Sequence, residues 1–234
     1  MTWLGSAWEA VSGETELWAA LLGAVIGGGI SLWAAKIGLR EARKQRAEDR
    51  DERQKALANS MIFKLRRIYS TLANMNENLE RAEKKEAELK CDPWQTFKPI
   101  INVPGPIYFT SDEMALLLSL KDNDLFNEIA ELDEAHNALL EALKEAGNHR
   151  RSLTDQLKSL AVGIEGDAVT GEMSEKQMRT LRPTMLEVDS LIIDVRINIR
   201  KDTERSGRAL EQLVRLLREK VGITYQLQLV KPAG

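Results

Sequence analysis

The stretch Leu17–Ala35 constrains the chain most, because it runs for nineteen residues without a charged side chain: LWAALLGAVIGGGISLWAA. At about 1.5 Å of rise per residue, a helix of this length crosses the roughly 30 Å hydrocarbon core of a bilayer. Trp18 and Trp33 stand near its two ends, where indole rings prefer to lie in membranes. The sequence therefore predicts a transmembrane helix, which we place at residues 17–39.

The residues on either side of this span predict its orientation. Residues 1–16 contain three glutamates and no Lys or Arg, so they lack the basic region of a signal peptide. Their apolar spacing predicts a short amphipathic segment on the outer membrane surface, with a frayed tail as the alternative. Basic residues crowd the other side: Lys36, Arg40, Arg43, Lys44 and Arg46. Because cytoplasmic flanks carry the excess of Lys and Arg, we expect the N-terminus outside the membrane and the rest of the chain in the cytoplasm.

One face of the predicted span is made of small residues at steps of three and four: Ala20, Gly23, Gly27, Ser31, Ala34 and Gly38. Such a face lets helices in a membrane approach closely. The pattern predicts a homo-oligomer, which we take as a tetramer, with Gly23, Gly27 and Ser31 at the helix contacts.

Two interpretations of the span remain open from its residues. In the first, the small-residue face is a tight anchor or dimer seam. In the second, the helices form a ring whose apolar lining, with Val25, Ile26 and Ile30, closes a pore by dewetting.

The composition limits the chemistry that the rest of the chain can perform. Its 234 residues allow one anchor and one further domain, and the net charge of −3 argues against binding nucleic acid over the whole surface. Cys91 is the single cysteine, and His136 and His149 are the only histidines, so a disulfide and the usual zinc sites are excluded. Because no hydrolase, nucleotide-binding or metalloprotease motif occurs either, we expect no enzyme, no cofactor and no metal.

After the span, the sequence predicts one long helix to Lys90, because residues 36–90 contain no proline and only Gly38. We assign residues 40–90 to a stalk that joins a bundle. Glu41–Lys55 is almost wholly charged and predicts a solvated helix. From there an apolar seam recurs every three or four residues: Leu57, Met61, Leu65, Ile68, Leu72, Met75, Leu79 and Ala82.

Residues 91–234 are expected to form a cytoplasmic helical sensor domain, so the fold class is mainly all-α, with a few short strands. Cys91–Thr110 is a structured proline-rich connection. Helices are expected from Ser111, from the region of Lys121–Asp124, and from Pro183 to Val221, with a turn-rich loop at Gly163–Gly171. Short strands are expected at Ile100–Val103, Ile107–Phe109 and Ile223–Val230.

The last predicted helix carries the densest basic surface outside the membrane flank. Between Arg196 and Lys220, eight basic residues face four acidic ones. A solvated charged face is the alternative to a phosphate-binding role. The candidate ligand-binding residues are Arg150, Arg151, Arg196, Arg200, Arg205 and Arg208.

The stretch FTSDEMALLLSLKDNDLFNEI (Phe109–Ile129) is followed by a His-Asn turn and a second helix that ends in Arg150-Arg151. In this the chain resembles small bacterial proteins with a GAVIGG-type N-terminal span and a cytoplasmic helical domain. Its layout is similar to the single-span membrane effectors of anti-phage defence, such as the Hailong-type and CRISPR-accessory effectors.

The resemblance implies a homo-oligomer that opens or disrupts the inner membrane once a nucleotide or oligonucleotide binds its cytoplasmic part. It carries over no functional residue. The alternative is a membrane-anchored helical scaffold that recruits a cytoplasmic protein partner.

Overall fold

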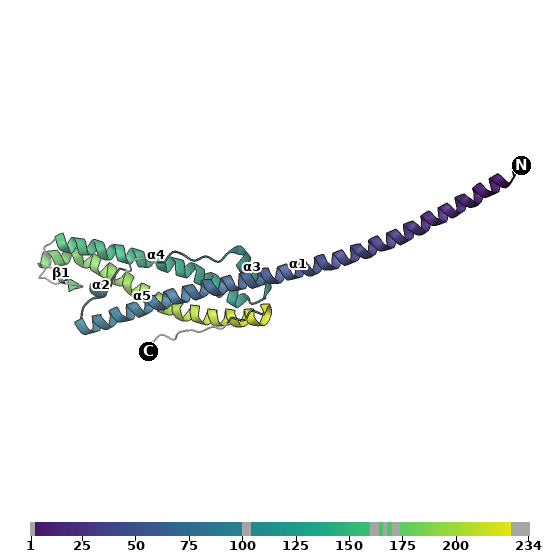
Figure 1. Cartoon of the computed structure of the whole chain (residues 1–234). Helices are drawn as coiled ribbons and strands as arrows, with labels where there is room; N and C mark the ends of the chain where they lie inside the picture. Colours follow the sequence, from purple (N-terminus) through teal and green to yellow (C-terminus); the bar gives the residue numbers. More distant parts are fainter. Residues whose placement is uncertain (1–2, 100–103, 160–163, 166–167, 170–173, 226–234) are drawn as a thin grey trace. The chain divides into compact units, whose positions relative to one another are not determined.

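A computed structural model describes residues 3–99, 104–159, 164–165, 168–169 and 174–225; side chains are described from Trp33 onward, except those of Ala34 and of the four residues at 164–165 and 168–169. The helices are α1 (Trp3–Leu89), α2 (Pro93–Thr96), α3 (Ser111–Ser119), α4 (Asn123–Ser159) and α5 (Glu175–Val221) (Figure 1). Strands β1 (Ile164–Glu165) and β2 (Ala168–Val169) pair antiparallel within the predicted loop. Helix accounts for 88% of the described residues, which confirms the mainly all-α class.

Helix α1 is a single helix, as predicted, and ends where Lys90 takes a φ of 50°. Its charged stretch is solvated, because the described side chains of residues 35–53 are all exposed. The chain divides into two compact units, residues 1–53 and 54–234. The domain boundaries that the sequence predicted, after residues 16, 39 and 90, stay predictions.

The predicted span Leu17–Ala35 lies within the bounds of α1, but nearly all of its side chains lie outside the described residues. This holds for every predicted packing and pore residue: Gly23, Val25, Ile26, Gly27, Ile30 and Ser31. In the part of the chain that the structure describes, no helix has an apolar stretch long enough to cross a membrane.

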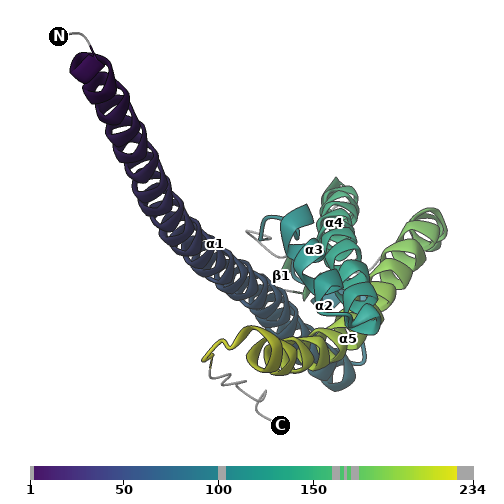
Figure 2. The same cartoon turned by 90° about the vertical axis from the view of Figure 1, so that its right-hand side faces the viewer.

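Within the unit 54–234, three long helices pack around two apolar clusters (Figures 1 and 2). One cluster joins Ala58–Leu65 of α1 to the start of α4 and the end of α5. The other joins Ile68–Leu79 of α1 to the later part of α4 and the start of α5. Helices α1 and α4 therefore run parallel, and α5 runs antiparallel to both. The predicted seam of α1 is confirmed, with Leu57 and Ala82 half-buried at its two ends.

Because α1 and α4 are parallel, the connection between them must return along the whole bundle. It buries Trp94, Phe97 and Ile107 in one of the two clusters, which explains why a proline-rich stretch is so apolar. Gly147 of α4 permits its close approach, since a Cβ there would lie 3.3 Å from the Cβ of Pro99.

The prediction of a strand at Ile107–Phe109 is wrong. The side chain of Asn137 accepts a hydrogen bond from the Ile107 N–H at 3.1 Å and donates one to the Ile107 carbonyl at 2.9 Å. The Phe109 N–H donates to Asp133. Side chains of α4 thus satisfy the backbone groups that a partner strand would have paired. Ile223–Tyr225 forms no strand either, and the remainder of that prediction, like Ile100–Val103, lies outside the described residues.

Helix α3 begins at Ser111 as predicted, and its N-cap is Thr110, whose side chain accepts a hydrogen bond from the Glu113 N–H. Two other helix boundaries differ from the prediction. Helix α4 continues through His136–Asn137 without a turn and beyond Arg150-Arg151 to Ser159.

Helix α5 begins eight residues before Pro183, because Ser174 and Gln177 form a capping box that starts it earlier. Pro183 therefore lies inside the helix. The predicted end is confirmed, since Gly222 stops the helix with a left-handed φ of 73°.

Candidate functional site

Arg196, one of the predicted ligand-binding residues, is buried and already paired. Its guanidinium donates two hydrogen bonds to Glu86 of α1, at 2.8 Å and 2.5 Å, in the bidentate geometry that makes such pairs strong. The Thr96 hydroxyl donates to the same carboxylate. Arg196 thus joins α5 to the end of α1 and to α2.

Arg200 and Arg205 also contact carboxylates of this chain. Arg200 pairs with Glu83 at 3.0 Å on the surface. Arg205 donates to Glu128 at 3.0 Å and to Glu131 at 2.7 Å, both on α4, and lies 3.5 Å from Asp202. The pKa of Arg205 is raised above that of an ordinary arginine, mainly by the hydrogen bond to Glu128, so its side chain stays positively charged. Burial raises the pKa of the neighbouring Asp202 carboxyl.

The other three predicted residues do not converge with these. Arg150 donates from Nε to the Trp94 carbonyl at 3.2 Å, whereas Arg151 and Arg208 are exposed. Arg196, Arg200 and Arg205 on α5 are therefore ion-paired with carboxylates of α1 and α4. An anion would have to displace carboxylates there, and the ligand-binding role of these arginines stays a prediction.

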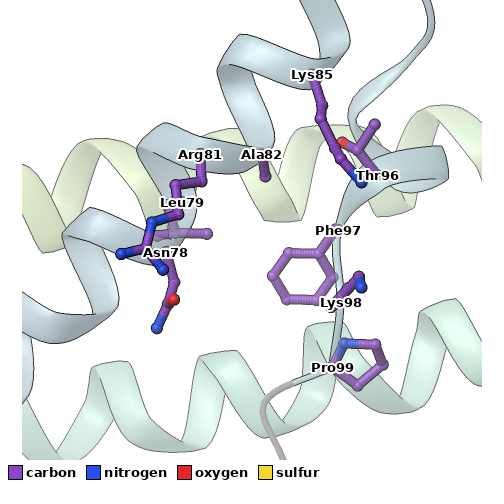
Figure 3. A pocket seen from close by; sticks show the side chains of 9 residues that line it. All are labelled: Asn78, Leu79, Arg81, Ala82, Lys85, Thr96, Phe97, Lys98 and Pro99. Carbon is purple, nitrogen blue, oxygen red and sulfur yellow. The ribbon is translucent and has the colours of Figure 1, made fainter. Parts of the chain in front are cut away.

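A pocket that the sequence did not predict lies between the last turns of α1 and the segment that follows α2 (Figure 3). It has a volume of about 420 Å³, within the range of small-molecule sites. Its lining residues are Asn78, Leu79, Arg81, Ala82, Lys85, Thr96, Phe97, Lys98 and Pro99. We call this space the α1–α2 pocket.

The α1–α2 pocket combines basic and apolar side chains. Among the described residues, the charged side chains of the lining are Arg81, Lys85 and Lys98, while Leu79, Ala82, Phe97 and Pro99 form apolar walls. The sequence signal was the pair Arg81 and Lys85, one turn apart at the end of a predicted seam, followed by a basic residue within an apolar, proline-rich segment. No pattern in the sequence predicted that the connection folds so that Lys98 lies beside α1.

The remaining reactive groups offer little chemistry. Burial lowers the pKa of His136 to about 4, with a smaller effect from the nearby charge of Arg67, so its ring is neutral at pH 7. Burial, followed by Glu86 and Asp92, raises the pKa of the Cys91 thiol, which disfavours the nucleophilic thiolate. Within the described ranges, no group of His, Cys, Asp and Glu side chains could hold a metal ion.

The fold and the pocket together describe a bundle of three long helices, in which α1 forms one wall of the pocket and also contains the predicted membrane span. No family model, no curated protein and no solved structure matches the chain.

Proposed function

We propose that the protein is a homo-oligomeric membrane effector of bacterial anti-phage defence, held in the inner membrane by Leu17–Ala35 and controlled by an anionic ligand, a nucleotide or oligonucleotide. One observation carries the proposal: α1 contains both the predicted span and, in its last turns, one wall of the α1–α2 pocket. Ligand binding and membrane permeability are then properties of the same helix.

The packing of α1 supports this coupling. From Met61 to Leu79, its buried seam contacts α4 and α5, so a ligand that shifts the end of α1 also changes the packing of the bundle. In the proposed closed state, a ring of apolar side chains from Val25, Ile26 and Ile30 excludes ions. Widening the ring wets it and opens the pore.

The test places a polar group in the ring. We expect Ile26→Asn to depolarise bacteria and slow their growth without any signal, because a polar side chain stabilises water in a narrow apolar pore. Ile26→Leu, which keeps the apolar character and volume, is the matched control. Membrane potential and growth are followed at equal membrane abundance, and equal values for Ile26→Asn and wild type would refute the pore.

The scaffold alternative has its own support on α5. Leu186, Ile193 and Ile197 are 59%, 44% and 57% exposed, and their spacing places them along one side of the helix. Such a stripe fits a partner helix. A scaffold predicts that an unrelated Leu-rich span preserves function, whereas an effector with a gated span loses it.

A further inference from the structure

We propose that two copies of this chain pack their α5 helices against each other, parallel and in register, along an exposed stripe of α5. The stripe consists of Leu186, Ser190, Ile193 and Ile197, and we call it the α5 stripe. The inference adds a second interface, outside the span, to the oligomer proposed above. It rests on that proposed function only for the attachment of both copies to one membrane.

The spacing of the α5 stripe is that of a coiled-coil seam. Its four residues follow at steps of four, three and four, and all four are exposed. This spacing keeps side chains on one face of a helix, where they meet a second helix with the same spacing. The bundle uses a different face of α5, since Val188, Ile192 and Val195 are buried in an apolar cluster with α1 and α4. The α5 stripe is therefore left over for a further helix.

The charges beside the α5 stripe are self-complementary in a parallel pair. In such a pair, a residue on one flank lies across from the residue five positions later on the partner helix. Arg182 and Glu187 stand in this relation, and both are exposed. Neither side chain has a hydrogen bond or an ion pair within the described part of its own chain. Two copies can thus form two Arg182–Glu187 pairs, one on each side of the stripe.

The next two positions with this spacing, Asp189 and Asp194, are like-charged. Asp189 is half-buried, however, and its carboxylate accepts a hydrogen bond from the Trp94 N–H at 2.8 Å inside its own bundle. The repulsion is therefore smaller than between two solvated carboxylates.

Membrane attachment favours a second copy over a freely diffusing partner. A stable interface between free proteins buries about 1,600 Å² in total, more than three apolar side chains per copy can cover. Copies held in one membrane meet at an effective concentration in the millimolar range, at which a small interface is sufficient. Both copies enter the membrane through the same end of α1, so we take their α5 helices, which run antiparallel to α1, to point the same way.

The experiment is disulfide crosslinking of the full-length chain in bacterial membranes. A Cys91→Ser background removes the single cysteine. Ser190→Cys then places a thiol on the α5 stripe, where it meets the same residue of a second copy. Asn198→Cys, also exposed but on a different side of α5, is the matched control. After mild oxidation we expect a linked dimer for Ser190→Cys and at least about tenfold less for Asn198→Cys, because Cα atoms more than about 7 Å apart are not bridged.

Two further changes in the Ser190→Cys chain test the contacts themselves. Ile193→Glu should reduce the linked dimer at least about tenfold, because it buries an unpaired charge in the interface. Arg182→Glu should reduce it about two- to fivefold, because like charges then face each other, and adding Glu187→Arg should restore it. All three positions are exposed, so the helical circular dichroism should stay that of the wild type.

The proposal is overturned if Ser190→Cys forms no linked dimer, if Asn198→Cys links as efficiently, or if the double charge reversal restores nothing. A different protein seated on the α5 stripe, as in a scaffold, would give the first of these results. The proposed function fails separately. Crosslinking that depends on Ile193, in a protein whose Ile26→Asn variant keeps its membrane potential, would refute the pore and keep the α5 interface.

Discussion

Glu113 shows how one buried carboxylate can hold a short helix in place. It is 1% exposed, accepts from Lys64 Nζ at 2.7 Å and Ser60 Oγ at 2.6 Å, and caps α3 through the Thr110 N–H. Burial alone would raise the pKa of this carboxyl, but the hydrogen bonds from Lys64, Ser60 and Thr110 outweigh burial and lower it. Glu113 therefore stabilises the fold as the ionised group.

We expect Glu113→Gln to lower the free energy of unfolding by about 2 kcal/mol at pH 7, because it leaves Lys64 without its anionic partner. A lowered carboxyl pKa stabilises the fold fully above the ordinary value of 4.5, and this contribution disappears as pH falls through the lowered pKa. The difference between variant and wild type should therefore shrink in acid. Denaturant unfolding at pH 7 and pH 3 measures it, with the exposed Glu211→Gln as control. A constant difference would contradict the ionised role.

His136 is the opposite case, a buried polar group without a partner. Neither ring nitrogen has a hydrogen-bond partner among the described residues, and the side chain lies on α4 between Leu132 of one apolar cluster and Leu139 of the other. An unpartnered buried polar group costs free energy.

We expect His136→Leu to stabilise the protein by about 1–2 kcal/mol at pH 7, since it removes that cost. Because the pKa of His136 falls from 6.5 to about 4 on folding, the unfolded chain binds the extra proton, and stability decreases as pH falls from 6.5 towards 4. The variant should lose this part of the pH dependence, as measured by denaturant unfolding at pH 7 and pH 5. His149→Gln, at a partly exposed histidine of the same helix, serves as the control. A destabilised His136→Leu would indicate a bound water or partner at the ring.

At the scale of elements, the sequence predicted what depends on local pattern and missed what depends on long-range contacts. The continuity of α1 and its seam from Leu57 follow from helix propensity and periodicity. The extended backbone at Ile107 depends instead on Asn137, thirty positions later, and reads as a strand when taken alone. For the same reason, the sequence predicted Arg196 as a ligand-binding residue and not as half of an ion pair, since its partner Glu86 is 110 residues away.

The ion pairs between elements differ in strength according to their burial. Arg196→Ala should destabilise the protein by about 3–5 kcal/mol, because it leaves Glu86 largely buried without its cation. Arg200→Ala, one turn further along α5, should cost less than about 1 kcal/mol, because the Arg200–Glu83 pair is half-exposed. Thermal unfolding of the two variants side by side tests this. Equal losses would show that burial does not distinguish the pairs.

At the scale of the whole molecule, we expect the predicted small-residue face to determine whether the chain assembles into the proposed homo-oligomer. Gly27→Leu should disrupt the homo-oligomer, because close approach of membrane helices requires small side chains at their contacts. Chemical crosslinking in mild detergent compares the variant with wild type, and Leu22→Ile, away from the small-residue face, is the control. A monomeric wild type, or an undisturbed oligomer in Gly27→Leu, would reject the packing.

The exposed charged stretch of α1 at residues 35–53 also determines where the chain is cut most easily. Its described side chains are exposed, so this part of the helix is held by backbone hydrogen bonds and by exposed ion pairs such as Lys44–Glu48, and a helix of this kind opens readily in water. Trypsin has several sites there, including Arg43, Lys44, Arg46 and Arg50. Brief digestion of the folded protein should therefore cleave in this stretch first and release the bundle from Gln54 onward as a resistant fragment, identified by mass spectrometry.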